Sequence, residues 1–143
     1  MNVLFVCTGN TCRSPMAQAI AIQEAEKQNI SLSAESAGIY ANEGSPLSKN
    51  SRMVLENDFG IEGFYHTAQI CTKANIQEAD LVFGMTEHHA VLLRQLFGED
   101  DKIRCFPTDV GDPYGGDLAR YRRCGEEIAA GIRKLIEENI LHD

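Results

Sequence analysis

A short polar loop near the N-terminus separates an apolar segment from a helix-forming one. Residues 3–6 read Val-Leu-Phe-Val, which is typical of a buried strand, and residues 16–21 read Met-Ala-Gln-Ala-Ile-Ala, which favours a helix. The loop between them, residues 7–15, reads Cys-Thr-Gly-Asn-Thr-Cys-Arg-Ser-Pro. This order puts Cys7 at the end of the strand and Arg13 in the first turn of the helix. The segment therefore predicts a strand–loop–helix unit with two reactive side chains in its loop.

The chemistry of this loop suits a phosphoryl group. Backbone N–H groups in the first turn of a helix lack intrahelical partners, and the helix dipole adds partial positive charge there, so a loop wrapped around that end binds a tetrahedral dianion. Arg13 adds a forked pair of charged donors, and the same environment stabilises the thiolate of Cys7. Gly9 and Asn10 tolerate the left-handed backbone that a closed loop needs. The pattern indicates a cysteine-dependent phosphatase.

Ser14 has two possible roles in this loop. With Pro15 behind it, Ser14 suits the cap of the helix, since proline favours the first helical position. The Ser14 hydroxyl can instead donate a hydrogen bond to the Cys7 thiolate.

Cys7 itself has a structural alternative, in which it is a buried thiol followed by an ordinary turn. The arginine, glycine and serine nearby favour a functional cysteine.

Length and charge limit the classes of function. A chain of 143 residues suits one domain, and a net charge of −8 disfavours a nucleic-acid partner. No apolar segment approaches membrane-spanning length and no signal peptide precedes the first strand, so we expect a cytoplasmic protein without a membrane partner.

Five cysteines, an odd number without an export signal, predict reduced thiols rather than a disulfide framework. Cys71, Cys105 and Cys124 lack metal-ligand spacing, and the histidines at 88–89 point apart on a helix, so we expect no metal and no cofactor. Cys12 differs because it shares a closed loop with Cys7 and can trap an oxidised Cys7 as a disulfide. This suggests reversible oxidative inactivation.

The rest of the chain alternates strand and helix patterns. Strands are expected at residues 32–37, 81–85 and 103–106, and helices at residues 45–57, 86–98 and 118–141. Such alternation predicts a right-handed, doubly wound parallel sheet. Ligands in these sheets bind at the carboxyl ends of the strands, where the loop at residues 7–15 lies.

Residues 6–15 resemble the active-site loop of the low-molecular-weight protein tyrosine phosphatases. The segment Ser-Ala-Gly at 36–38 is similar to the segment after that family's second strand, and Asp-Pro-Tyr at 112–114 is similar to its general-acid loop. The resemblance covers the whole chain and implies one low-molecular-weight phosphatase domain at residues 1–143. It also implies a four-stranded parallel sheet in the order 2-1-3-4 with helices on both faces.

By this resemblance Cys7 is the nucleophile, Arg13 the phosphate clamp and Asp112 the general acid. The chemistry needs such an acid, because the leaving group must be protonated and a water molecule must then be activated to hydrolyse the phosphocysteine. Taken alone, Asp112 could be a turn residue among glycines and a proline. Asp109 is its nearest rival but lacks the following proline, and Asp117 is expected to start the last helix.

The resemblance also implies supporting groups. The remaining residues implied to bind phosphate or substrate are Thr8, Gly9, Asn10, Thr11, Cys12, Ser14, Tyr40 and Tyr114, the two tyrosines as walls of the cleft. His66 is implied to order Asn10 and Ser14, and Ser36 is implied to support the loop. The tyrosines could instead serve packing, and His66 could be a half-exposed turn residue.

Thr11 bears on the substrate. Tyrosine-specific members of the family usually carry a larger aliphatic residue here, whereas bacterial members that resemble protein arginine phosphatases carry threonine. A small hydroxyl-bearing wall leaves room for a flat guanidinium, whose nitrogens Asp112 can bind. Glycines after Tyr114, where many eukaryotic relatives carry a second tyrosine, trim the aromatic wall. We therefore expect hydrolysis of phosphoarginine in phosphorylated proteins through a phosphocysteine, with phosphotyrosine as the alternative.

Two other classes of function use related sites. An arsenate reductase has the same fold and loop but needs two more cysteines as a relay, and Cys71, Cys105 and Cys124 are too far apart in sequence to show that pattern. A catalytically dead phosphate-binding module would lack the nucleophile or the acid, and Cys7 and Asp112 are both present.

Overall fold

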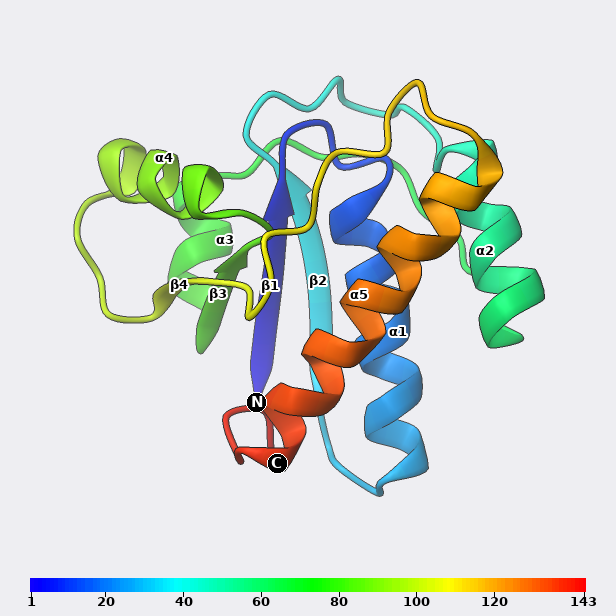
Figure 1. The fold of residues 1–143 in the computed structure, drawn as a ribbon. Coiled ribbons are helices and arrows are strands. Elements are labelled where there is room, and N and C mark those ends of the chain that lie inside the picture. The colour runs from blue at the N-terminus through cyan, green and yellow to red at the C-terminus, as the bar shows by residue number, and fades with distance from the viewer.

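Four parallel strands form one sheet in the order β2-β1-β3-β4 in this computed structural model, which describes residues 1–143 (Figure 1). The strands are β1 (Asn2–Cys7), β2 (Ser33–Gly38), β3 (Leu81–Gly84) and β4 (Ile103–Cys105). The helices are α1 (Arg13–Lys27), α2 (Lys49–Phe59), α3 (Lys73–Glu78), α4 (Glu87–Phe97) and α5 (Leu118–Glu137). The predicted fold class and strand order are confirmed.

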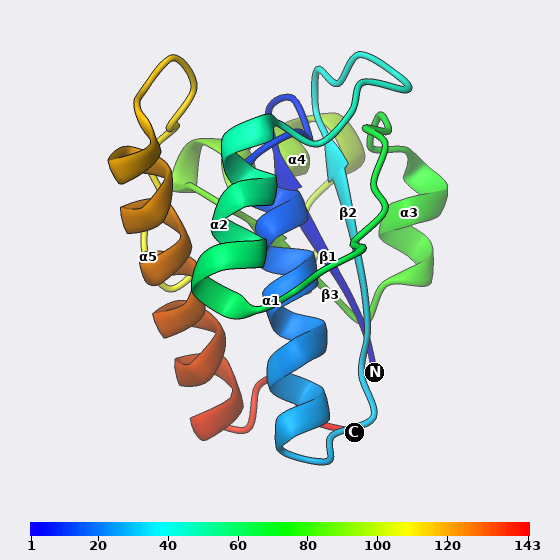
Figure 2. The same cartoon turned by 90° about the vertical axis from the view of Figure 1, so that its right-hand side faces the viewer.

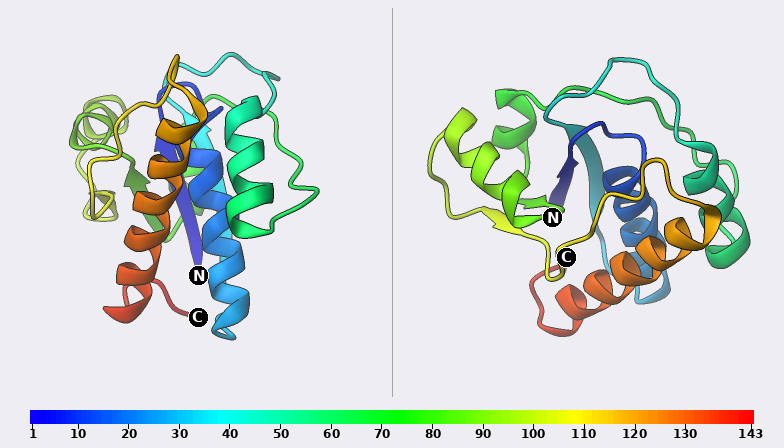
Figure 3. Two further views of the ribbon diagram at one scale, coloured as in Figure 1. Left: turned by 45° about the vertical axis from the view of Figure 1, so that its right-hand side comes forward. Right: turned by 45° about the horizontal axis from the view of Figure 1, so that its top comes forward.

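Helices cover both faces of the sheet. α1, α2 and α5 lie on one face, and α3 and α4 lie on the other (Figures 2 and 3). The central strand β1 feeds both layers, because Val3 and Phe5 belong to the larger core cluster and Leu4 and Val6 to the smaller one. A strand buried on both faces has to be apolar throughout, which is why residues 3–6 show no polar alternation. No helix is both long and apolar enough to cross a membrane.

The helix expected from residue 45 begins later, at Lys49. Ser48 caps it, since its Oγ accepts a hydrogen bond from the backbone N–H of Ser51. Pro46 instead forms an antiparallel bridge with Thr67, so the Ser-Pro pair lies in extended backbone. The prediction was wrong because a serine–proline pair suits both a helix start and an extended connection.

Helix α3 was not expected at all. Thr72 and Asn75 form a reciprocal capping box at its start, but the helix has only six residues, too few to show a clear apolar period. Helix α5 ends at Glu137 rather than at residue 141, and Asn139 then takes a left-handed φ of 58°. As predicted, Thr86 caps α4, Gly98 ends it and Asp117 caps α5.

Candidate active site

The loop that joins β1 to α1 lies at the carboxyl ends of the strands. The segment between β4 and α5 crosses in front of β1 and rises toward the same end of the sheet (Figure 1). Together the two segments form one cavity, lined by Cys7, Thr8, Gly9, Thr11, Cys12, Arg13, Asp112 and Tyr114. The structure therefore brings together the thiol of Cys7, the guanidinium of Arg13 and the carboxyl of Asp112, although Asp112 is distant from the other two in sequence.

Ser14 hydrogen-bonds the thiol and does not cap the helix. Its Oγ lies 2.9 Å from Cys7 Sγ, and the N-cap of α1 is Cys12, which makes no side-chain capping bond. Asn10 Nδ2 donates to Ser14 Oγ at 2.9 Å, so the serine hydroxyl keeps its own proton for another acceptor. Cys7 Sγ is a closer acceptor than the Ala37 carbonyl oxygen at 3.4 Å. The arrangement lets Ser14 donate to a thiolate, the second of its two possible roles.

Asn10 makes several of the hydrogen bonds that hold the loop in place. It is fully buried and takes the left-handed φ of 55°. Its side chain donates to Ser14 and, at 3.0 Å, to Ser36 Oγ, and its Oδ1 accepts from the backbone N–H of Gln69 at 3.0 Å. His66 Nε2 donates to the Asn10 carbonyl oxygen at 2.7 Å, so His66 reaches Ser14 only through Asn10. Burial lowers the pKa of His66, and its bond to that carbonyl opposes the shift in part.

Gly38 lets the end of β2 touch the loop. A Cβ on this glycine would lie 2.6 Å from the Thr8 carbonyl oxygen and 3.0 Å from the Asn10 nitrogen, both backbone atoms that the loop cannot easily move. The backbone N–H of Tyr40 donates to the same Thr8 carbonyl at 3.0 Å. Ser36 to Gly38 therefore belong to β2 itself, not to the segment after it as the family resemblance implied.

Arg13 joins the loop to the segment that carries the carboxyl. The guanidinium is buried, its Nη1 donates to the Val110 carbonyl oxygen at 3.1 Å, and its Nη2 lies 3.9 Å from Asp112 Oδ2. One side of the guanidinium is thus anchored, and the other side faces the cavity between thiol and carboxyl. Asp112 itself is 55% exposed, and its Oδ1 accepts from the backbone N–H of Tyr114 at 3.0 Å.

Asp109, the other candidate for the general acid, instead has a structural role. Asp109 Oδ1 accepts from the backbone N–H of Glu87 at 2.8 Å, which satisfies the first turn of α4. Asp109 does not line the cavity, whereas Asp112 does. Of the two tyrosines, Tyr114 lines the cavity and Tyr40 does not, and both side chains are exposed.

Cys12 and Thr11 connect the loop to its neighbours. Thr11 lines the cavity, and its carbonyl oxygen accepts from the backbone N–H of Ser48 at 3.0 Å, just before α2. Cys12 Sγ lies 3.5 Å from Ser48 Oγ and 3.6 Å from the Tyr121 hydroxyl on α5. All five cysteines are free thiols. Burial raises the pKa of Cys71 to about 11 and that of Cys124 to about 12, which makes both unreactive.

The sequence interpretation missed His89 as part of this site. It is 3% exposed, and its ring nitrogens contact two threonines: Nε2 lies 2.9 Å from Thr8 Oγ1, and Nδ1 lies 2.9 Å from Thr86 Oγ1. Burial, followed by the positive charge of Arg13, lowers its pKa to about 4. One signal in the sequence was available: His89 lies three residues after Thr86, the cap of α4, and α4 follows β3, the neighbour of β1. The histidine pair was instead tested only as a metal site.

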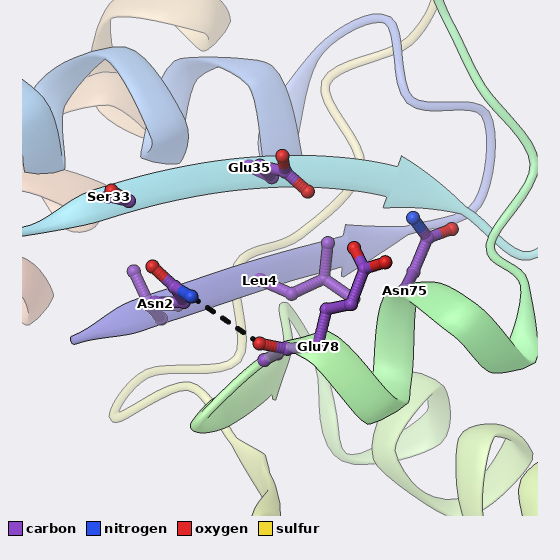
Figure 4. A pocket seen from close by; sticks show the side chains of 8 residues that line it. Asn2, Leu4, Ser33, Glu35, Asn75 and Glu78 are labelled. Atoms are coloured by element: carbon purple, nitrogen blue, oxygen red, sulfur yellow. Dashed lines mark hydrogen bonds between the residues drawn. The ribbon is translucent and has the colours of Figure 1, made fainter.

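A second concavity lies toward the amino ends of β1 and β2, beside α3. Figure 4 shows its lining, in which the carboxylates of Glu35 and Glu78 flank the side chain of Leu4, and Asn75 lies next to Glu78. Asn2 Nδ2 donates to the Glu78 carbonyl oxygen at 3.5 Å. No nucleophilic thiol or basic side chain lines this concavity, so it does not suit a phosphoryl anion.

The buried His89 and the half-buried His66 predict an acid-sensitive fold. The pKa values of His66 and His89 lie below their ordinary 6.5 in the folded chain, that of His89 at about 4. As the pH falls from about 6.5 to about 4, the unfolded chain therefore binds protons first, and the free energy of unfolding decreases. Urea denaturation across this pH range should show the decrease, and His89→Gln should flatten it. His142→Gln at the exposed C-terminus is the control and should keep the wild-type slope; a pH-independent wild type would contradict the prediction.

The low molecular weight phosphotyrosine protein phosphatase family model matches residues 2–142. A protein-arginine-phosphatase of Geobacillus stearothermophilus is 38% identical to this chain, with 95% of this chain and 94% of that protein covered. The low molecular weight protein-tyrosine-phosphatase PtpB of Staphylococcus aureus is 32% identical, with 94% and 96% covered. Among solved structures, a cysteine-to-serine variant of the YwlE arginine phosphatase with a phosphorylated active-site serine superimposes with a TM-score of 0.91 at 31% identity, covering 96% of this chain and 95% of that chain.

Proposed function

The chain belongs to the low molecular weight phosphotyrosine protein phosphatase family, whose members are cysteine-dependent phosphatases, and we propose that it hydrolyses phosphoarginine in proteins. The observation that carries this choice of substrate is Thr11, which lines the cavity together with Cys7 and Asp112. Phosphoarginine differs from phosphotyrosine in its leaving group, a flat polar guanidine instead of an apolar ring. A small side chain with a hydroxyl leaves room for the guanidine and offers it a hydrogen-bond acceptor.

In the first step the Cys7 thiolate attacks phosphorus and a phosphorus–sulfur bond forms as the phosphorus–nitrogen bond breaks. Arg13 and the loop N–H groups neutralise the charge on the phosphoryl oxygens. Asp112, protonated at this stage, gives its proton to the departing guanidine nitrogen. Its position 3.9 Å from the guanidinium of Arg13 keeps the acid beside the group that holds the phosphoryl oxygens. The products are arginine in the protein and a phosphocysteine.

In the second step water hydrolyses the phosphocysteine. Asp112, now a carboxylate, takes a proton from the water molecule as its oxygen bonds to phosphorus. The phosphorus–sulfur bond breaks, and the electron pair returns to sulfur as a thiolate. Ser14 Oγ, 2.9 Å from Cys7 Sγ, stabilises that thiolate by donating a hydrogen bond to it. Asp112 is protonated again, the thiolate is restored, and inorganic phosphate leaves.

The relatives support both the mechanism and the substrate. The YwlE variant carries its phosphoryl group on the serine that replaces the active-site cysteine, as expected for a phosphoryl-cysteine mechanism. The Geobacillus relative is a protein-arginine-phosphatase. Five free thiols suit a reducing compartment, so the proposed substrates are phosphorylated proteins of the cytoplasm. A net charge of −8 argues against a nucleic-acid partner.

Phosphotyrosine is the second candidate substrate. Tyr114 lines the cavity and is 80% exposed, so its ring could lie against the ring of a phosphotyrosine. The Staphylococcus relative is a protein-tyrosine-phosphatase. Glycines at 115–116 leave Tyr114 without a second aromatic neighbour in sequence, which weakens this candidate.

Phosphate release from matched phosphoarginine and phosphotyrosine peptides tests the proposal. We expect a kcat/KM for phosphoarginine at least about tenfold above that for phosphotyrosine. Thr11→Ile should lower the kcat/KM for phosphoarginine, because the larger side chain takes up the room that the guanidine needs. Thr11→Ser, which keeps the hydroxyl, is the matched variant and should retain the preference. A wild-type preference for phosphotyrosine would overturn the choice of substrate but leave the cysteine mechanism intact.

A further inference from the structure

Thr8 is held from two sides by elements that are distant in sequence. Its carbonyl oxygen accepts from the Tyr40 N–H after β2, and its Oγ1 lies 2.9 Å from His89 Nε2 in α4. Thr8 also lines the cavity around Cys7. The contact with His89 thus joins a buried ring of the α4 layer to a side chain in the phosphate-binding loop.

The hydroxyl of Thr86 contacts the other ring nitrogen of His89. Thr86 Oγ1 accepts from the backbone N–H of His89 at 3.2 Å, as the cap of α4. Its own proton has one acceptor within hydrogen-bond distance, His89 Nδ1 at 2.9 Å. When Nδ1 accepts a hydrogen bond from this proton, the single proton of the neutral ring lies on Nε2. The low pKa of His89, about 4, keeps the ring neutral at neutral pH.

Nε2 then donates to Thr8 Oγ1, which sets the direction of the threonine's own proton. A hydroxyl oxygen that accepts one hydrogen bond donates its proton away from that donor. Thr8 Oγ1 makes no other hydrogen bond within the protein, and Thr8 lines the cavity, so its proton is free to be donated to a group bound there. An anion bound there provides an acceptor.

We propose that His89 is a positioning residue that, as its Nε2-protonated tautomer, holds Thr8 so that the Thr8 hydroxyl donates a hydrogen bond to an oxygen of the bound phosphoryl group. This inference rests on the proposed function for its use in catalysis, but not for the binding of phosphate itself. Thr8 thereby adds a side-chain donor to the backbone N–H groups and to Arg13, which already gives one Nη1 hydrogen bond to the Val110 carbonyl oxygen. The chain Thr86–His89–Thr8 makes the start of α4 part of the phosphate site.

Nitrogen-detected NMR of the unmodified protein tests the tautomer first. We expect His89 Nε2 to carry the proton and Nδ1 to carry none, near neutral pH and with or without inorganic phosphate. A protonated Nδ1 would overturn the proposal, because Thr8 would then donate to His89 and turn only lone pairs toward the anion.

Inorganic phosphate binding and turnover then test the consequence. Thr8→Val keeps the shape of an exposed side chain and removes the hydroxyl, and we expect phosphate to bind about tenfold more weakly. Thr8→Ser should recover most of this loss. His89→Ala should weaken binding in the same direction, His89→Gln should restore part of it through its amide donor, and Thr8→Val/His89→Ala should be no worse than the stronger single variant. His88→Ala, an exposed neighbour on α4, is the control and should bind phosphate as the wild type does.

The results distinguish a failure of this inference from a failure of the proposed function. Full phosphate affinity in Thr8→Val, or additive losses in the double variant, would overturn the inference even if the wild type hydrolyses phosphopeptides. A wild type that binds phosphate with the expected dependence on Thr8 but hydrolyses no phosphopeptide would overturn the proposed function and leave the inference standing. Thermal unfolding of each variant separates a loss of fold from a loss of the hydrogen bond.

Discussion

Replacing Cys7 by serine is expected to lower phosphate release by at least about 10⁴-fold, because a serine hydroxyl is far less nucleophilic than a thiolate. The fold should persist, since the substitution exchanges one buried atom beside Ser14 Oγ, 2.9 Å away. The measurement is kcat with a phosphoarginine peptide, accompanied by the midpoint of urea unfolding. Cys105→Ser, a partly exposed thiol that does not line the cavity, is the matched control and should keep wild-type activity. More than a tenth of wild-type activity in Cys7→Ser would contradict the assignment of the nucleophile.

Replacing Asp112 by asparagine is expected to lower kcat by about 10²–10⁴-fold, the range typical of a lost general acid. Asparagine keeps the shape and the acceptor for the Tyr114 N–H at 3.0 Å, but it can neither protonate a guanidine nor deprotonate water. With a substrate whose leaving group departs without protonation the first step no longer needs the acid, but the second step still needs Asp112 as a base, so a loss should persist.

Asp109→Asn is the control that separates the two aspartates. An asparagine at this position can still accept from the Glu87 N–H, now 2.8 Å from Asp109 Oδ1, so the fold should hold. We expect near-normal kcat in Asp109→Asn. A larger loss in Asp109→Asn than in Asp112→Asn would show that the general acid had been assigned to the wrong residue.

The loop and the parallel sheet could be predicted because their signals are local and redundant, whereas the strand order 2-1-3-4 was implied by the family resemblance. Cys7, Gly9, Arg13 and the flanking strand and helix all indicate an anion-binding turn, and the alternation of elements then predicts a parallel sheet. Asp112 was implied by the family resemblance, and the topology agrees with it, since the segment after β4 begins at the carboxyl edge of the sheet.

What could not be predicted depends on contacts between distant segments. The sequence allows Ser14 either to cap α1 or to donate to Cys7. Asn10 selects the second role, because its side-chain N–H donates to the Ser14 oxygen and leaves the hydroxyl proton free for Cys7. The start of α2 depends on Pro46 pairing with Thr67, a residue that lies beyond that helix. The histidines at 88–89 were considered only as a metal site, and only the packing of α4 against the loop buries His89 beside Thr8.

The most direct test of the phosphocysteine mechanism is mass spectrometry of the intact protein, quenched within milliseconds of mixing with a phosphoarginine peptide and followed by peptide mapping. We expect one phosphoryl group on the protein, attached to Cys7, appearing before inorganic phosphate accumulates and absent in the unreacted protein. Release of phosphate without any phosphoryl group on Cys7, or with the group on another side chain, would contradict the mechanism.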